Sequence, residues 1–309
     1  MGLLPLNAEA QAWMVAAAAE AARELGLYAA LDRPRTVGEL ANILGVAPRR
    51  LRALVDVLAC AGVLTRSSGD EVPTFTRGAA SPTPAAMPRH GWGRLAEILT
   101  QDRPLLSDDE QELDRFHTYL RAAGAASARA LMAELTQLPS AQRGLVDLGG
   151  GAGAYTEAFL AALPGAPATL VDRAPVIALA RPHLSGRASL VAGDLFDAAT
   201  ASGEGHGIAL LANVLHLYGA RDCQRLIARA VASVVAGEGW IVVQDLFVAP
   251  DRTGPLASLL FALNMAVYTN EGDVHDGAQI VEWLTHAGLV DVQCARRGDD
   301  EIVVRGRRP

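Results

Sequence analysis

The 309-residue sequence predicts an α/β fold in which a smaller, mostly helical domain precedes a doubly wound, mainly parallel sheet. After residue 144, short runs of Val, Leu and Ile alternate with helical patterns, which is typical of successive strand–helix–strand units. Before residue 80, apolar residues recur at helical spacing and only two short runs resemble strands. The last two strand-like runs, "VDVQCAR" and "EIVVRG", are too close for a helix between them, so an antiparallel hairpin is expected to end the sheet.

The N-terminal region carries several helix boundary signals. Residues 9–31 are rich in Ala and Leu and are predicted to form one helix with a wide apolar stripe. Thr36 and Glu39 form a capping-box pattern, Gly45 is expected to end that helix, and Pro48 is expected to begin the next one. The runs "GVLTR" and "VPTFTR" then predict a small hairpin, and the whole pattern is that of a winged helix.

A winged helix is used for DNA binding or for packing against another chain. Arg49, Arg50 and Arg52 begin the helix that would enter a DNA groove, but residues 1–80 contain eight arginines and eight acidic residues. Since DNA-binding domains normally carry a basic excess, we favour a homodimer formed through the Ala-rich first helix. A DNA-binding regulator that senses a small ligand is the alternative from another functional class.

The composition excludes several kinds of protein. Half of the residues are hydrophobic, the formal charge is −7, and no apolar run approaches the ~20 residues that span a bilayer. The three cysteines form no CxxC pair and are expected to be reduced, and no metal site is predicted. All 27 basic residues are arginine, which excludes chemistry that needs a lysine, such as Schiff-base formation. We therefore expect a cytoplasmic protein that binds neither nucleic acid nor membrane.

The chain divides into three predicted parts. Residues 1–90 form the winged-helix domain, which ends in the proline-rich segment 79–90. Residues 91–140 form a helical linker region, and residues 141–309 form the domain that contains the sheet. No internal repeat of fixed period is present.

The first strand of the sheet runs into a glycine-rich turn, "LVDLGGGAGAYTEAFL". Asp147 stands at the strand end and is followed by Gly149, Gly151 and Gly153, and then by a helix. Such a turn needs backbone angles that favour glycine and lets a ligand approach the backbone, so it predicts a nucleotide site. The spacing differs from G-x-G-x-x-G, with Ala154 in the place of the last glycine, and does not indicate a diphosphate.

Two further acidic residues follow the next two strands. "TLVD" ends in Asp172, nineteen residues after Gly153, where a carboxylate binds ribose hydroxyls in nucleotide-binding folds. "VAGDLF" places Asp194 and Leu195 after the third strand, where they suit the edge and the face of an adenine. The ordered set of strand-end residues predicts one nucleoside site at the sheet edge.

Together these motifs resemble S-adenosylmethionine-dependent small-molecule methyltransferases of the caffeic acid O-methyltransferase type, including their bacterial natural-product relatives. The similar stretches cover nearly the whole chain: "VDLGGGAGAY", "VDRAPVIALAR", "GDLF", "NVLHLY", "GEGWIVVQDLF" and "EWLTHAGL". The resemblance implies a Rossmann-like catalytic domain, an N-terminal winged helix that mediates dimerisation, a linker region that lines the substrate pocket, S-adenosylmethionine as cofactor, and a small-molecule acceptor.

The resemblance also implies roles for individual residues. His216, at the end of the apolar run "LLANVLH", falls on the general base, and Asp245 falls on a carboxylate that orients it. The positions implied for the cofactor site are Asp147, Gly149, Gly151, Gly153, Asp172, Asp194, Leu195 and Asn213. The positions implied for the acceptor pocket are Phe116, His117, Leu120, Met265 and Tyr268.

Three positions differ from the family pattern. Ala212 replaces a lysine that contacts the cofactor, and Asp245 is one methylene shorter than the family's glutamate. A second orienting glutamate aligns with Val274 in "DVHD", where Asp273 is one residue away. Asp245 and Asp273 are therefore both candidates to orient His216.

The expected reaction is methyl transfer to a hydroxyl of an aromatic or polyketide-type secondary metabolite. A methyl group on a sulfonium is already activated, so the enzyme has to align an oxygen with it and accept the proton of that oxygen. A histidine, with a usual pKa near ~6.5, can accept the proton of a phenol, near ~10, as the new bond forms. Two alternatives keep the fold and the cofactor: C-methylation, and a non-methylating cyclisation, decarboxylation or hydroxylation with His90, His117 and His275 as further acid–base candidates.

Overall fold

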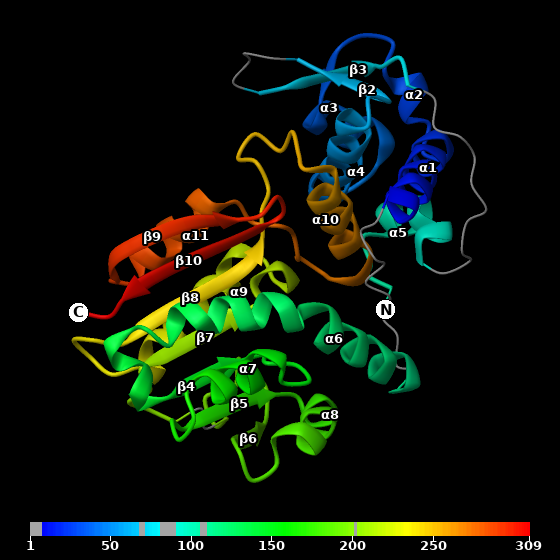
Figure 1. The fold of residues 1–309 in the computed structure, drawn as a ribbon. Coiled ribbons are helices and arrows are strands. Elements are labelled where there is room, and N and C mark those ends of the chain that lie inside the picture. Colours follow the sequence, from blue (N-terminus) through cyan, green and yellow to red (C-terminus); the bar gives the residue numbers. More distant parts are fainter. Residues whose placement is uncertain (1–7, 68–71, 81–90, 106–109, 201–202) are drawn as a thin grey trace.

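The computed structural model describes residues 8–67, 72–80, 91–105, 110–200 and 203–309 (Figure 1). Its N-terminal unit contains α1 (Ala8–Glu24), α2 (Leu27–Ala30), α3 (Val37–Leu44) and α4 (Pro48–Cys60), with strands β1 (Arg35–Thr36), β2 (Leu64–Arg66) and β3 (Thr74–Arg77). Strands β2 and β3 pair antiparallel, as the winged-helix pattern predicts. Residues 81–90 of the proline-rich segment, including His90, lie outside the described residues.

The boundaries of α3 and α4 follow the signals in the sequence. The Thr36 hydroxyl accepts a hydrogen bond from the backbone N–H of Glu39 at 3.2 Å, and the Glu39 carboxylate accepts one from the N–H of Thr36 at 2.8 Å. Gly45 ends α3 with a φ of 64°, and Pro48 is the first residue of α4. The capping box and both boundaries are confirmed.

The first helix is shorter than expected and uses its apolar face within the chain. The prediction of one helix over residues 9–31 is wrong, because Gly26 adopts a φ of 77° and separates α1 from α2. The alanine face of α1 packs in the N-terminal core against α4 and α10. Its most buried members, at 3% exposure or less, are Ala17, Ala18, Ala21 and Ala22. This packing covers much of the apolar stripe without a second chain, and the homodimer stays a prediction.

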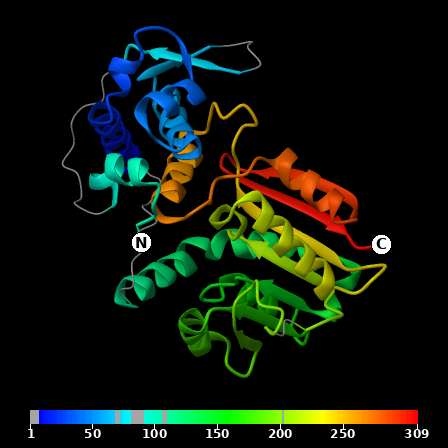
Figure 2. The same ribbon diagram turned by 180° about the vertical axis from the view of Figure 1, so that it is seen from behind.

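Helices cover both faces of the main sheet. The linker region contains η1 (Gly91–Arg94), α5 (Leu95–Gln101), α6 (Glu110–Leu135) and η2 (Pro139–Arg143). Helix α6 crosses the face that also carries α7 (Ala154–Ala162) and α8 (Ala174–Leu184) (Figure 1). Helices α9 (Ala220–Ser233) and α11 (Gly277–His286) cover the opposite face (Figure 2). No described helix combines the length and the apolar character needed to cross a bilayer.

The main sheet of the described chain has the strand order β6-β5-β4-β7-β8-β10-β9. Its strands are β4 (Leu145–Leu148), β5 (Ala168–Asp172), β6 (Ser189–Ala192), β7 (Ile208–Ala212), β8 (Trp240–Leu246), β9 (Val290–Arg297) and β10 (Glu301–Arg307). Strands β4 to β8 pair in parallel, whereas β10 pairs antiparallel with β8 and β9, which confirms the C-terminal hairpin. The strand order reverses between β4 and β7, and doubly wound sheets bind ligands at such a point.

Alternate residues of the central strands face different helix layers. In β4, Val146 packs with α9 and α11, whereas Leu145 packs with α6 and α7. In β8, Val243 and Val242 alternate in the same way. Since side chains on a strand alternate with a period of two, Asp245 points to the side of α9 and α11.

The core of the N-terminal unit is completed by α10 (Leu256–Tyr268), a helix from the C-terminal half of the sequence. Leu259 and Leu263 are buried in the same hydrophobic cluster as Leu54 and Leu58 of α4. Figure 1 shows α10, in orange, beside α4 and α5. The divisions at residues 90 and 140 stay predictions, and the structure adds that the third part supplies a helix to the core of the first.

The three arginines at the start of α4 contact other parts of the same chain. Arg49 and Arg52 bind residues of the loop that follows α10, and Arg50 is fully buried. The feature that suggested DNA binding therefore has an intramolecular explanation.

Candidate active site

The candidate site residues gather at the carboxyl edge of the parallel strands, on both sides of the point where the strand order reverses. The glycine-rich turn follows β4, Asp172 ends β5, and Leu195 follows β6. His216 follows β7 within η3 (Leu215–Leu217), and Asp245 lies near the end of β8. One edge of the sheet therefore carries both the candidate cofactor residues and the candidate base.

The glycine-rich turn uses backbone conformations that other residues rarely adopt. Gly149, Gly151 and Gly153 have φ angles of 79°, 59° and 89°. A Cβ at Gly149 would lie 2.8 Å from the side chain of Val214, whereas a Cβ at Gly151 would meet nothing closer than the Nδ1 of His117, 3.7 Å away. The turn is thus tightly packed beside Val214 at Gly149 and lies within van der Waals range of His117 at Gly151.

The Asp172 carboxylate joins the glycine turn to the end of β5. One of its oxygens accepts a hydrogen bond from the backbone N–H of Gly151 at 2.9 Å. Leu195 lies beside the turn, with its Cδ1 3.4 Å from the position of a Cβ on Gly149. The structure therefore brings the ends of β4, β5 and β6 together, as the sequence predicts.

Tyr218 is a residue at this edge that the sequence analysis missed. Burial raises the pKa of Tyr218, and the charges of Asp172 and Asp194 raise it further. Its ring contacts Phe196 with the centroids 5.1 Å apart, and the exposed Asp194 accepts a hydrogen bond from the N–H of Phe196 at 2.8 Å. Its position two residues after His216 was the available signal.

Asp147 supports the glycine turn from beneath. The side chain is 1% exposed and accepts a hydrogen bond from the Thr156 hydroxyl at 2.7 Å. A Cβ at Gly150 would lie 2.7 Å from its carboxylate. Burial raises the pKa of Asp147 to about 7, although the bond from Thr156 opposes the shift. The structure places Asp147 under the turn, on the side of α7, and not on the open surface that a cofactor would contact.

Asn213 belongs to a polar network that extends behind the site. Asn213 adopts a φ of 56°, and its amide donates to the Tyr155 hydroxyl at 3.3 Å. Gln244, which is fully buried, donates to the same hydroxyl and to the hydroxyl of Ser127, both at 2.8 Å. Burial raises the pKa of Tyr155 to about 12, so the phenol stays neutral. The network ties the end of β7 to β8 and α6, and no motif in the sequence indicates its other members.

Two hydrogen bonds hold His216 to Asp245. The Nδ1 of His216 lies 2.7 Å from one carboxylate oxygen, and the backbone N–H donates to the other oxygen at 3.2 Å. Both side chains are buried, at 8% and 5% exposure. Burial opposes ionisation of Asp245, but the neighbouring His216 and its hydrogen bonds hold the pKa of this carboxyl below its usual value. An ionised Asp245 makes Nδ1 the donor and leaves Nε2 as an acceptor.

Of the two carboxylates that were candidates to orient His216, Asp245 contacts the ring. Asp273 instead pairs with Arg52 at 2.8 Å and with Arg252 at 3.1 Å. Val274, which occupies the position implied for a second orienting carboxylate, is an apolar residue with 1% exposure.

On α6, the expected acceptor residues lie close to the glycine turn. Phe116 and His117 contact each other with ring centroids 5.3 Å apart, and His117 lies over Gly151. Burial lowers the pKa of His117, whereas the charge of Asp172 opposes this shift. Leu120 is half-buried one turn further along the helix. His117 is therefore placed beside the candidate cofactor site.

On α10, the expected acceptor residues face the N-terminal core and η1. Met265 is 2% exposed within the N-terminal core, and a Cβ on Gly91 would lie 2.7 Å from the hydroxyl of Tyr268. Phe261, which the sequence analysis missed, packs its ring against His216 with the centroids 4.8 Å apart and the planes at 82°. Phe261 precedes Met265 by one helical turn, and this spacing was the available signal.

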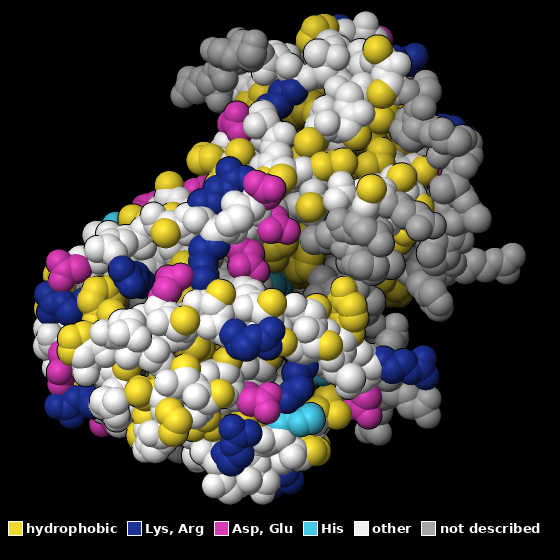
Figure 3. All heavy atoms as spheres, viewed as in Figure 1, with side chains coloured by type: hydrophobic (Ala, Val, Ile, Leu, Met, Phe, Trp, Pro, Cys, Tyr) yellow, Lys and Arg dark blue, Asp and Glu magenta, His cyan; other side chains and the backbone are white. Residues whose placement is uncertain are grey.

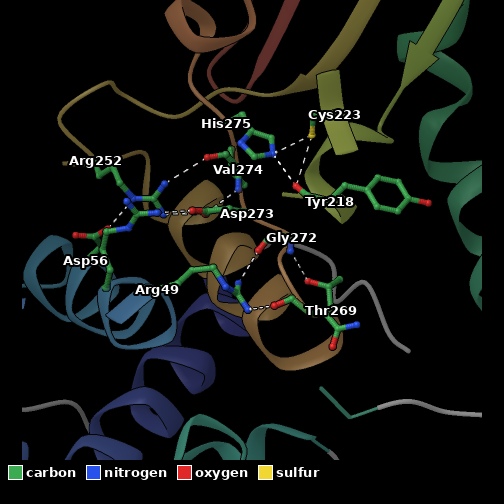
Figure 4. Close-up of polar contacts among 12 residues, drawn as sticks. Arg49, Asp56, Tyr218, Cys223, Arg252, Thr269, Gly272, Asp273, Val274 and His275 are labelled. Atoms are coloured by element: carbon green, nitrogen blue, oxygen red, sulfur yellow. Dashed lines mark hydrogen bonds and ion pairs between the residues drawn. The ribbon is translucent and has the colours of Figure 1, made fainter. Parts of the chain in front are cut away.

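A cysteine and a histidine meet behind the His216 turn. The Sγ of Cys223 lies 3.5 Å from the Nε2 of His275, which is 3.0 Å from the backbone oxygen of Tyr218 (Figure 4). Burial raises the pKa of the Cys223 thiol to about 12, so it is not an activated nucleophile. Within the described ranges, no group of three or more His, Cys, Asp or Glu side chains is arranged to hold a metal ion.

The O-methyltransferase domain is the family whose sequence profile matches this chain, over residues 104–290. The tetracenomycin polyketide synthesis 8-O-methyl transferase of Streptomyces glaucescens is 26% identical, in an alignment that covers 93% of this chain and 91% of that protein. Acetylserotonin O-methyltransferase of Bos taurus is 34% identical over 53% of this chain, and the alignment spans about half, 47%, of the bovine protein.

Solved structures share the fold. The O-methyltransferase family 2 protein of Planctomyces limnophilus, in complex with apigenin, has a TM-score of 0.75 and 25% identity, covering 97% of this chain and 93% of that chain. Human N-acetylserotonin methyltransferase, in complex with S-adenosylmethionine, has a TM-score of 0.63 and 24% identity, covering 100% and 99% of the two chains. Since the matching domain covers more than half of the sequence and the fold agrees along its length, the chain belongs to the O-methyltransferase family.

Proposed function

We propose that this enzyme transfers a methyl group from S-adenosylmethionine to a hydroxyl of an aromatic or polyketide-type secondary metabolite, with His216 as general base. The observation that carries the proposal is the buried pair of His216 and Asp245 at the same sheet edge as the glycine turn. The name of the Streptomyces relative and the apigenin in the Planctomyces structure support this class of acceptor.

The residues at the sheet edge fit S-adenosylmethionine. A Cβ at Gly151 would come within van der Waals range of His117, at 3.7 Å from its Nδ1, so the glycine leaves to a ligand the space that a side chain would fill. The Asp172 carboxylate accepts from the backbone N–H groups of Gly151 and Arg173, one on each oxygen, and each oxygen keeps a further lone pair for a ribose hydroxyl. Leu195 provides an apolar face next to Gly149, and the exposed Asp194 provides a nearby acceptor.

His216 is suited to accept the proton of the substrate hydroxyl. When S-adenosylmethionine is bound, it supplies a methyl group that its sulfonium has already activated. The proton of the substrate hydroxyl passes to the Nε2 of His216, and the imidazolium that results is stabilised by Asp245, 2.7 Å from Nδ1. Because both side chains are buried, this attraction is stronger than it would be in water. The edge contact with Phe261 restricts the ring further.

The proposal is tested by incubating the purified protein with S-adenosylmethionine and a panel of phenolic and polyketide acceptors. We expect S-adenosylhomocysteine to accumulate and the product to carry its new methyl group on oxygen, as fragmentation mass spectrometry would show. A new methyl group on carbon would replace the proposal by C-methylation. Conversion of an acceptor without consumption of S-adenosylmethionine would favour a cyclisation, decarboxylation or hydroxylation.

We also propose that the enzyme is a homodimer through its N-terminal domain. The support is the resemblance of this domain to the dimerisation domain of the family, together with Trp13 and Val15 of α1, which are only half-buried within the chain. Light scattering on the intact protein should give twice the chain mass of 32.3 kDa. A monomer at working concentration would contradict the proposal.

A further inference from the structure

The loop between α10 and α11, residues 269–276, lies directly on the turn that carries His216. Gly272 of this loop is buried, and a Cβ there would lie 2.5 Å from the backbone oxygen of His216. Further along the loop, His275 contacts the backbone oxygen of Tyr218 at 3.0 Å (Figure 4). A displacement of this loop would therefore displace the backbone on which His216 is mounted.

Two arginines of α4 hold the loop from the side of the N-terminal unit. Arg49 donates to the backbone oxygens of Asn270 at 2.6 Å and of Gly272 at 2.8 Å. Arg52 pairs with the Asp273 carboxylate at 2.8 Å. The winged-helix part of the chain is thus bonded to the same short segment that contacts the His216 turn.

Arg252 joins the loop to two other segments. It lies in the connection between β8 and α10, and it bonds to Asp56 of α4 at 2.7 Å, to Asp273 at 3.1 Å and to the backbone oxygen of Val274 at 3.3 Å. These charged side chains are 14% exposed or less, so removal of one partner would leave a poorly solvated charge. Figure 3 shows basic and acidic side chains side by side over the junction of the two units.

We propose that Arg49, Arg52 and Arg252 are positioning residues for methyl transfer, which hold the 269–276 loop against the His216 turn. The proposal rests on the proposed role of His216 as general base. The turn that carries His216 is a single three-residue 3-10 segment, and the imidazole ring of His216 is hydrogen-bonded to Asp245. Its backbone position therefore depends on contacts from outside. Through the arginines, the N-terminal unit sets where the Nε2 of His216 lies relative to the substrate.

The test compares Arg49→Ala with Arg49→Lys and uses Arg23→Ala as a matched control. Arg23 pairs with Glu20 on the exposed side of α1, within the same N-terminal unit but away from the loop. Since a misplacement of about 1 Å lowers a rate by up to about 100-fold, we expect Arg49→Ala to lower kcat by about 10- to 100-fold. The KM for S-adenosylmethionine should change by less than about twofold, because the glycine turn is untouched. Arg49→Lys keeps the charge but loses the fork by which two nitrogens reach the oxygens of Asn270 and Gly272, so it should recover part of the loss.

Hydrogen exchange measures the turn itself and does not require methyl transfer. The backbone N–H groups of Leu217 and Tyr218 donate to the oxygens of Val214 and Leu215, so their exchange reports opening of the turn. Arg49→Ala should accelerate exchange in a peptide that spans this turn, and Arg23→Ala should not. If Arg49→Ala does not fold, Gly272→Ala provides the same test, since its Cβ would press on the backbone oxygen of His216.

The outcomes separate this proposal from the one on which it rests. Unchanged kcat with unchanged exchange in Arg49→Ala would overturn the positioning role. A lower kcat without faster exchange, or faster exchange with normal kcat, would overturn it as well. Failure of the base assignment has another signature: His216→Ala would keep its turnover, while exchange at the turn would still be faster in Arg49→Ala.

Discussion

The glycine turn and the His216 turn lie at the same edge of the sheet, but they are held in different ways. The glycine turn is fixed by Asp147 beneath it and by Asp172 at the end of the next strand. The His216 turn is fixed by Asp245 of β8, Phe261 of α10 and the 269–276 loop, which is bonded in turn to α4. The first is built within two neighbouring strand–helix units, and the second is built from segments that are far apart in the sequence.

This difference predicts two kinds of sensitivity. A substitution in the glycine turn or in Asp172 should affect cofactor binding, because the residues that support the turn, Asp147 and Asp172, belong to its own strand and the next one. The His216 turn should instead respond to substitutions that are distant in the sequence. For example, Arg49 and Gly272 are 223 positions apart and are joined by a hydrogen bond. Substitutions that separate cofactor affinity from turnover therefore test the comparison directly.

The largest effect is expected at the His216 turn. His216→Ala should lower turnover by about 10²- to 10⁴-fold, the range that general-base catalysis supplies, and should leave the affinity for S-adenosylhomocysteine nearly unchanged. Turnover and calorimetric titration of the same preparation measure the two quantities. If the variant melts at a lower temperature but its folded fraction turns over normally, His216 is a packing residue. The His216 turn would then have no catalytic role.

The opposite separation is expected at the glycine turn. Asp172→Ala should weaken binding of S-adenosylhomocysteine by about 2 to 3 kcal/mol, or about 30- to 150-fold, through loss of charge-assisted hydrogen bonds. At saturating cofactor, turnover should approach that of the unmodified protein, since the His216 pair is untouched. Calorimetry that shows unchanged affinity would remove Asp172 from the cofactor site.

An intermediate effect is expected for the residue that orients the base. Asp245→Asn keeps the shape of the side chain but removes the charge that fixes the ring tautomer and stabilises the imidazolium, so turnover should fall by about 10- to 100-fold. Cofactor affinity should be retained. If Asp273→Asn slowed turnover as much as Asp245→Asn and left hydrogen exchange at the turn unchanged, Asp273 would act on the base by a route other than the loop.

The sequence predicted best the features that depend on neighbouring residues. The capping box of Thr36 and Glu39, the end of α3 at Gly45, the parallel sheet with its C-terminal hairpin, and the position of Asp172 at the same sheet edge as the glycine turn all follow from local signals. Each of them is determined by backbone geometry or by the rule that parallel strands end at one edge, so a single stretch of sequence carries the information.

The features that were missed depend on faces and on distant contacts. Strand β4 is buried on both sides, so its sequence does not show that Asp147 points beneath the turn toward α7. Arg49, Arg50 and Arg52 resemble the start of a DNA-reading helix, but their partners come from other parts of the chain. The same holds for Asp273, which the resemblance made a candidate to orient His216 and which the structure pairs with arginines.

The smallest effect on cofactor affinity is expected at Asp147. This residue supports the glycine turn and is itself ionisable. Burial raises its pKa to about 7, whereas an aspartate in the unfolded chain titrates near ~3.9. Between about pH 4 and pH 7, the folded protein therefore retains a proton that the unfolded chain has released. Folding binds protons in this window, so the contribution of Asp147 to the free energy of unfolding falls as the pH rises.

Asp147→Asn removes this titration and can still accept the hydrogen bond from Thr156. The unmodified protein should lose stability as the pH rises from about 5 to about 8, and the variant should not lose this part of it. The difference in the free energy of unfolding should therefore shift in favour of the variant, as thermal unfolding at both pH values would show. Its affinity for S-adenosylhomocysteine should change by less than about threefold, because the side chain lies under the turn and not on its open surface. Parallel pH dependence of the two proteins would mean that Asp147 is ionised throughout this range. A loss of affinity as large as that of Asp172→Ala would place Asp147 in direct contact with the cofactor, and the glycine turn would then lack the separate buried support described here.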